Sequence, residues 1–72
     1  MKEYFFLLSS VTSAMKGEGI LRKNGYKAYV FRDTKMNPYG CGYVIKAAGN
    51  KESMAEILSK NGIRVNEIKE RR

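Results

Sequence analysis

The chain contains no histidine and no tryptophan, and it has one cysteine and one proline among its 72 residues. The lack of histidine excludes a Ser-His-Asp triad, a histidine proton shuttle and a histidine-based metal site. One cysteine cannot form an intrachain disulfide, and by itself it cannot supply a four-ligand zinc site. We therefore expect no metal and no cofactor, and a reducing compartment, the cytoplasm.

Acidic residues are also scarce. Fourteen Lys and Arg stand against seven Asp and Glu, which leaves a net charge of +7. This excess favours attraction to an anionic partner, whether RNA, an acidic protein surface or a small anion, but does not choose among them. Solubility alone explains the charge equally well.

Long hydrophobic runs are missing as well. The apolar run Tyr4–Leu8 is too short for a membrane span or a signal-peptide core, and Glu3 stands where a signal peptide carries only basic residues. Neither secretion nor membrane insertion is expected. A composition of 43% hydrophobic and 29% charged residues indicates a folded domain. A domain of this size buries only about 60% of its unfolded surface, so a homodimer would add stability.

Apolar patterning predicts four strands and two helices in the order βαββαβ. The strands are expected at 2–9, 26–31, 43–48 and 63–68, and the helices at roughly 11–24 and from Asn50 to Gly62. Hydroxyl or amide residues precede each helix, and Asn-Gly ends each one. Two split βαβ units give an α+β, ferredoxin-like domain over residues 1–72, with both helices on one face of a four-stranded antiparallel sheet.

The cysteine stands between two glycines, Gly40-Cys41-Gly42, after a turn-rich segment at 33–39. In the expected topology the first strand ends beside the start of the third, so Ser9 and Cys41 should lie close together. The first helix begins at that edge, and its unpaired N–H groups and nearby cations would lower the thiol pKa below about 8.5. The residues expected to stabilise a thiolate or small anion there are Ser9, Ser10, Thr12, Ser13, Arg32, Lys35, Gly40 and Gly42.

A second interpretation of Cys41 is structural. Free cysteine is among the most buried residue types and commonly serves as a small hydrophobic side chain. The flanking glycines favour access instead, because they admit close approach by a ligand or partner backbone. Both interpretations remain open at the level of the sequence.

Glu18 is unusual because its spacing with Ala14 and Leu21 places a carboxylate on or beside the packed face of the first helix. We expect a border residue whose carboxylate reaches solvent. The alternatives are a hydrogen bond from the backbone or an ion pair with a lysine.

One pattern of residues is made of Ser9-Ser10, Ala14, Glu18, Leu21, Asn24-Gly25, Lys35 and Gly40-Cys41-Gly42. With this pattern the chain resembles the small bacterial family of putative Se/S carrier protein-like domains over roughly residues 4–68. The resemblance implies a role in carrying sulfur or selenium between donor and acceptor proteins, with Cys41 holding a persulfide or selenosulfide. The chain departs from the family pattern in one loop, where Arg32, Thr34 and Pro38 stand in place of two prolines and a serine.

Two functions of different classes follow. The first is a sulfur or selenium carrier, not an enzyme in the strict sense, that uses the thiolate of Cys41. The second is a binding module with an inert Cys41 that uses the sheet face opposite the helices, either to form a homodimer or to bind RNA. Strand parity assigns Lys27, Tyr29, Phe31, Val44 and Lys46 to that face. A purely regulatory or structural domain is the third possibility.

Overall fold

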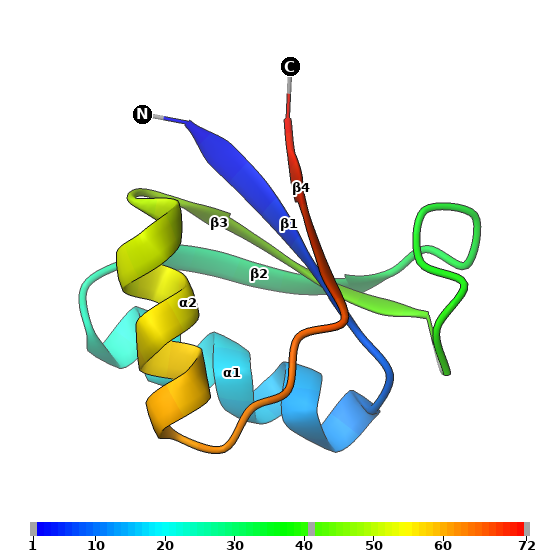
Figure 1. Ribbon diagram of the computed structural model, residues 1–72, viewed down its shortest axis with the longest axis horizontal. Helices are drawn as coiled ribbons and strands as arrows, with labels where there is room; N and C mark the ends of the chain where they lie inside the picture. The colour runs from blue at the N-terminus through cyan, green and yellow to red at the C-terminus, as the bar shows by residue number, and fades with distance from the viewer. Residues whose placement is uncertain (1, 41, 72) are drawn as a thin grey trace.

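The computed structural model describes residues 2–40 and 42–71. Its strands form one antiparallel sheet in the order β2-β3-β1-β4, and both helices cover the same face (Figure 1). The predicted α+β, ferredoxin-like arrangement is confirmed. The elements are β1 (Glu3–Leu8), α1 (Val11–Lys23), β2 (Lys27–Arg32), β3 (Tyr43–Ala48), α2 (Lys51–Lys60) and β4 (Glu67–Glu70).

Each helix begins at a residue whose side chain accepts a backbone N–H of the first turn. Ser10 caps α1 and accepts from the N–H of Ser13 at 3.4 Å. Asn50 caps α2 and accepts from the N–H of Ser53 at 2.8 Å. These bonds satisfy donors that have no partner inside the helix, which explains why the chain turns helical where the sequence predicts.

Each helix ends in a Schellman motif. After α1, the N–H of Tyr26 donates to the carbonyl of Leu21, and Gly25 adopts a φ of +89°. After α2, the N–H of Ile63 donates to the carbonyl of Leu58 at 2.9 Å, and the intervening Gly62 again has a positive φ. This motif places an apolar side chain just past the glycine, back against the last turn of the helix.

The motif explains an error in the predicted fourth strand. We expected that strand at 63–68, but β4 spans Glu67–Glu70. Ile63 is buried because it packs against the end of α2, not because it begins a strand. The same effect moves the start of β2 by one residue, from Tyr26 to Lys27.

The main core lies between the sheet and the two helices. Gly17 of α1 is buried there, and a Cβ atom on it would lie 2.9 Å from the side chain of Ile45 and 3.2 Å from that of Leu58. Its small size therefore permits close approach of α1 to the rest of the core. No helix within residues 2–40 and 42–71 has the length and apolar content needed to cross a membrane. The buried core cluster comprises Phe6, Leu8, Ala14, Leu21, Ala28, Ile45, Ala47, Met54, Leu58 and Ile63.

Candidate functional site

Three elements meet at one corner of the sheet. β1 and β3 are antiparallel central neighbours, and Leu8 at the end of β1 pairs with Tyr43 at the start of β3. The helix cap Ser10 follows two residues after Leu8, so α1 begins at the same corner (Figure 1). This is the meeting of strand ends and helix N-terminus that the sequence predicts.

Cys41 itself lies outside the described residues, so its predicted proximity to Ser9 stays a prediction. Its neighbour Gly40 is described and lies directly against Ser9. A Cβ atom on Gly40 would lie 2.1 Å from the carbonyl oxygen of Ser9, and the φ of Gly40 is +47°. Only glycine fits this close approach without displacing the Ser9 backbone.

Gly42, on the other side of the cysteine, is held by two backbone hydrogen bonds. Its N–H donates to the carbonyl of Tyr39, and its carbonyl accepts from the N–H of Asp33, each at 2.9 Å. Its φ is +75°, and a Cβ atom would lie 2.8 Å from the methyl group of Thr34. Both glycines of the Gly-Cys-Gly motif are thus required by the local backbone.

The loop before the cysteine is pinned to the sheet by Asn37, which is 1% exposed. Its Nδ2 donates to the carbonyl oxygens of Leu8, at 2.7 Å, and of Tyr43, at 2.6 Å. Its Oδ1 accepts from the N–H of Tyr39 at 2.9 Å. The side-chain amide therefore joins the loop to the end of β1 and the start of β3.

Sequence reasoning missed Asn37 as a positioning residue. The Asn37-Pro38 pair signals a turn, and the bond to Tyr39 is the turn bond that asparagine commonly makes. No local pattern indicates that the amide nitrogen also reaches Leu8, which lies 29 positions earlier in the chain.

Asp33 orders the first half of the same loop. Its Oδ1 accepts from the N–H groups of Lys35 and Met36, each at 3.0 Å, and its carbonyl accepts from the N–H of Asn37. The predicted cations Arg32 and Lys35 stand at the start of this loop, and both residues are exposed.

The predicted hydroxyl residues differ in their surroundings. Ser10 caps α1, so its side-chain oxygen already serves Ser13. Ser9 and Thr12 are exposed, while Ser13 is half-buried. The first turn of α1 contains no acidic residue, so no side chain there offsets the partial positive charge of the helix N-terminus.

The open sheet face is smaller than predicted. The register confirms that Tyr29 pairs with Lys46 and Phe31 with Val44 on one face. However, Val44 is fully buried, and so is Leu7, its partner on β1. The assignment of Val44 to an accessible binding surface is therefore wrong.

The loop 33–40 covers this end of the face. The carbonyl of Met36 accepts from Nζ of Lys69 at 3.4 Å, and the hydroxyl of Tyr39 lies 3.4 Å from a carboxylate oxygen of Glu67. Lys69 and Glu67 belong to β4 and pair with Phe5 and Leu7 of β1, so these contacts hold the loop over the sheet.

The rest of that face carries Lys27, Tyr29, Phe31 and Lys46. Tyr29 is 54% exposed, and Phe31 makes an edge-to-face contact with Phe5 at a centroid distance of 6.2 Å. Nζ of Lys46 lies 3.7 Å from a carboxylate oxygen of Glu3. Use of this surface for a homodimer or for RNA stays a prediction.

Glu3 is also bound by Arg71 at the C-terminal end of the sheet. The hydrogen bond from Arg71 and the positive charge of Lys46 hold the pKa of the Glu3 carboxyl below its usual value of 4.5. The pair fastens the end of β4 to the start of β1.

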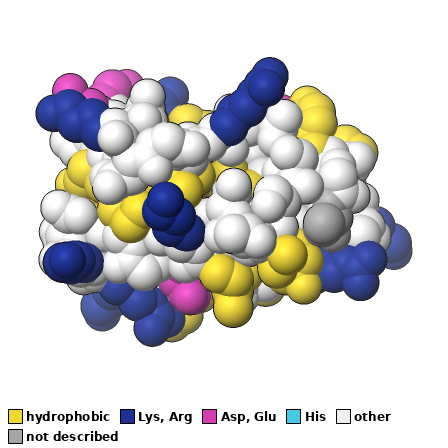
Figure 2. Space-filling model, turned by 90° about the horizontal axis from the view of Figure 1, so that it is seen from below, with side chains coloured by type: hydrophobic (Ala, Val, Ile, Leu, Met, Phe, Trp, Pro, Cys, Tyr) yellow, Lys and Arg dark blue, Asp and Glu magenta, His cyan; other side chains and the backbone are white. Residues whose placement is uncertain are grey.

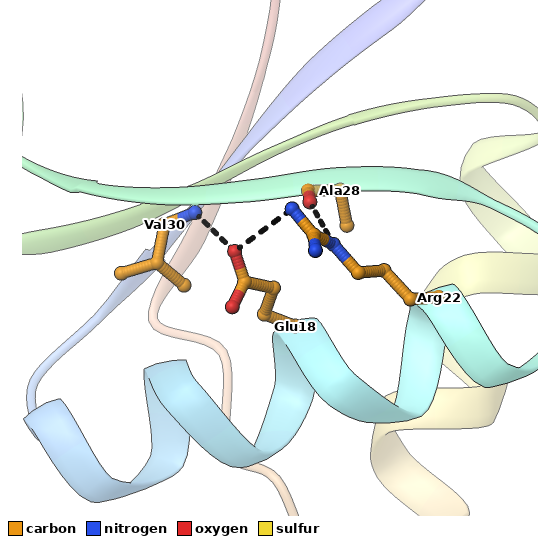
Figure 3. A network of polar contacts seen from close by, with 4 residues as sticks. All are labelled: Glu18, Arg22, Ala28 and Val30. Atoms are coloured by element: carbon orange, nitrogen blue, oxygen red, sulfur yellow. Dashed lines mark hydrogen bonds and ion pairs between the residues drawn. The ribbon is translucent and has the colours of Figure 1, made fainter.

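Glu18 forms a polar network with the outer edge of β2 (Figure 3). Its carboxylate accepts from the N–H of Val30 at 2.9 Å and lies 3.6 Å from the guanidinium of Arg22. Nε of Arg22 donates to the carbonyl of Ala28 at 2.7 Å. The alternative of a backbone hydrogen bond is thus confirmed for Glu18, while its cationic partner is an arginine and not a lysine.

This network satisfies backbone groups that the edge strand would otherwise present to solvent. β2 is one of the two edge strands of the sheet, and its outer edge is a potential template for pairing with another chain. The Arg22 guanidinium also lies 5.2 Å from the ring centroid of Tyr29, within cation-π range.

The family model described as Putative Se/S carrier protein-like matches residues 3–70, nearly the whole chain. The chain belongs to this family. No curated protein and no solved structure matches it. The resemblance drawn from Gly40-Cys41-Gly42 and its upstream residues is therefore confirmed at the level of the family.

Proposed function

We propose that this Se/S carrier-like protein accepts a sulfur or selenium atom on Cys41 and delivers it to a second protein. One observation carries the proposal. Gly40 lies against Ser9, one residue before the cap of α1, and Gly42 is bonded to the loop and precedes β3. Cys41 is joined covalently to both glycines, so these anchors support a thiol at the N-terminus of a helix.

Such a position suits the chemistry. A thiolate is the nucleophile in sulfur transfer, and helix N-termini and nearby cations favour the thiolate over the thiol. The first turn of α1 has no carboxylate to oppose that charge, and positive charge is added by Arg32 at the end of β2 and by Lys35 in the following loop.

The transfer step needs no external oxidant or reductant. The Cys41 thiolate attacks the terminal sulfur of a donor persulfide, and a new S–S bond forms while the donor S–S bond breaks. The donor leaves as a thiolate, and the transferred sulfur keeps its proton. Delivery repeats the exchange with an acceptor thiol as the attacking group. Because the chain has one cysteine, that acceptor thiol must belong to a partner.

Alkylation kinetics test the premise of an accessible thiolate. We expect iodoacetamide to modify Cys41 in the folded protein faster near pH 7 than it modifies the isolated peptide of residues 37–45. The peptide has the same thiol and neighbours but no folded helix. A rate equal to or below that of the peptide would remove the carrier function and leave the binding-module hypotheses.

A further inference from the structure

The face of the sheet opposite the helices carries a row in which aromatic and cationic side chains alternate. Tyr29 of β2 pairs with Lys46 of β3. Lys46 pairs in turn with Phe5 of β1, and Phe5 pairs with Lys69 of β4, so the row crosses all four strands. Neighbouring strands lie about 4.8 Å apart, so the row extends over about 14 Å. We call Tyr29, Lys46, Phe5 and Lys69 the aromatic-lysine row.

The aromatic rings on this face are open to solvent to different degrees. Tyr29 is 54% exposed, whereas Phe5 is half-buried. Phe31 stands two residues after Tyr29 on the same face, is half-buried as well, and contacts Phe5 edge to face. Tyr29 is therefore the ring most accessible to a stacking partner, and the two phenylalanines form an apolar surface beside it.

The charges of the face are mixed, with cations in excess. The Glu3 carboxylate lies 3.7 Å from Nζ of Lys46 and also binds Arg71, so these three charges largely satisfy one another. The other carboxylate, Glu67, lies near the hydroxyl of Tyr39. In full, the charged residues that the register places on this face are Lys27, Lys46, Lys69 and Arg71 against Glu3 and Glu67.

Two exposed lysines on this face stand next to the rings. Lys27 precedes Tyr29 by two residues on β2, and Lys69 is the pairing partner of Phe5. Neither lysine forms an ion pair with another residue of the described segments 2–40 and 42–71. Both ammonium groups are thus available to an anionic ligand that covers the rings.

Positive charge by itself does not distinguish this face. Figure 2, which views the molecule from below Figure 1, where both helices lie, shows Lys and Arg side chains spread over that side as well. What distinguishes the open face is the combination of exposed lysines with an exposed aromatic ring on a flat surface.

We propose that the aromatic-lysine row binds a single-stranded segment of RNA, with bases stacked on Tyr29 and against Phe5 and with phosphates bound by Lys27 and Lys69. This function is separate from the chemistry of Cys41 and does not depend on it. Stacking on aromatic side chains needs bases that are not paired in a duplex, and a four-stranded sheet can present two or three such bases. The binding should tolerate many sequences, because every base has a π face and lysine binds phosphate as a point charge.

A second copy of this chain fits the same face less well. A stable interface buries about 800 Å² on each partner around an apolar centre. Leu7 and Val44 on this face are fully buried and Phe5 and Phe31 are half-buried, which leaves little apolar surface for such a centre. A two-fold dimer would also bring a surface with more cations than carboxylates against itself.

The test measures the dissociation constant of a fluorescein-labelled oligouridylate of about ten nucleotides by fluorescence anisotropy over a series of salt concentrations. Tyr29→Ala removes the ring, and Tyr29→Phe keeps it. Met15→Ala is the matched control, because Met15 is 57% exposed on α1.

A pair of double variants tests the phosphate contacts. Lys27→Gln with Lys69→Gln removes the two lysines beside the rings. Lys16→Gln with Lys23→Gln changes the net charge equally but alters exposed positions of α1.

We expect Tyr29→Ala to raise the dissociation constant at least about fivefold, as for loss of one base-aromatic stack. Tyr29→Phe and Met15→Ala should bind as the parent protein does. Removing Lys27 and Lys69 should reduce the slope of log affinity against log salt concentration by about 1.4, since each phosphate contact on a single strand contributes about 0.7. The double variant of α1 should leave this slope unchanged.

Several results would overturn the proposal. One is the absence of saturable binding by the parent protein at low salt, and another is a Tyr29→Ala protein that binds as the parent does. If the parent does not bind the oligouridylate but forms a dimer in light scattering that Tyr29→Ala makes monomeric, the face belongs to a second copy.

The RNA site and the carrier function can fail independently. Cys41→Ser should bind the oligouridylate with the affinity of the parent protein. Failure of Cys41 to accept sulfur would therefore leave the RNA site standing, and loss of RNA binding would leave the carrier function standing. A Cys41→Ser protein that no longer binds the oligouridylate would overturn the separation of the two functions.

Discussion

Nδ2 of Asn37 lies 2.7 Å from the carbonyl oxygen of Leu8, so one buried amide joins the cysteine loop to the end of a central strand. The same nitrogen binds the carbonyl of Tyr43, the residue that pairs with Leu8 across the sheet. The loop that precedes Cys41 is therefore hydrogen-bonded to the sheet and is not a loose connection.

Replacing Asn37 tests this attachment of the loop to the sheet. In Asn37→Ala the two carbonyl oxygens lose a buried donor, and leaving buried acceptors unpaired is costly. We expect the free energy of unfolding to fall by about 2 kcal/mol. Urea denaturation gives the value, with Asn61→Ala as the control. Asn61 is exposed and binds only the carbonyl of Ile57 in its own helix. Equal losses for the two variants would show that Asn37 does not hold the loop.

Two glycine substitutions should change the free energy of unfolding in opposite directions. Gly40→Ala forces a Cβ onto the Ser9 carbonyl at a positive φ, so the free energy of unfolding should fall by about 2 kcal/mol or more. Gly19→Ala meets nothing within 4 Å in α1 and should stabilise the protein by about 0.5–1 kcal/mol. Thermal or urea unfolding of the two variants measures these changes. A Gly40→Ala protein as stable as the parent would refute the close approach at Ser9.

Glu18 should protect the edge of β2 from pairing with another chain. In Glu18→Ala the N–H of Val30 loses its acceptor and Arg22 loses its counter-charge, so we expect a loss of about 1 kcal/mol and self-association at high protein concentration. Urea denaturation and light scattering measure the two effects. Glu56→Ala is the control, because it breaks only the exposed ion pair with Lys60 and should cost less than about 0.5 kcal/mol. A monomeric Glu18→Ala protein at all concentrations would argue against the protective role.

Glu3 should contribute to stability in a pH-dependent way. Its folded-state pKa is lowered by Arg71 and Lys46, so its contribution is present above the unfolded value near 4.5 and is lost as the pH falls through the lower folded value. Glu3→Gln should therefore be less stable than the parent at pH 7, and the gap should close below pH 4.5. Urea midpoints across this range provide the check. A gap that stays constant down to acid pH would mean that Glu3 makes no net charge interaction.

The sequence predicts the fold well where signals are local. Ser10 and Asn50 mark the helix starts, and the alternation around Tyr29 marks β2, because each pattern reflects bonds or packing within a few residues. Ile63 is an exception, because a Schellman contact and a strand start both place an apolar side chain after Asn-Gly.

The site was less predictable because it depends on contacts between distant residues. The bond from Asn37 to Leu8 and the burial of Val44 beneath the loop both arise from folding of the loop over the sheet. Parity alone predicts an open position for Val44, and only the tertiary structure shows that it is buried. The Glu18–Val30 bond also joins residues twelve positions apart, although the helical spacing did single out Glu18.

The central claim is that Cys41 carries the transferred atom, and intact mass after incubation with a persulfide donor tests it most directly. We predict a mass increase of one sulfur atom on the parent protein, reversed by a thiol reductant and lost in Cys41→Ser. Unchanged mass for the parent, or the same increase in Cys41→Ser, would contradict the account.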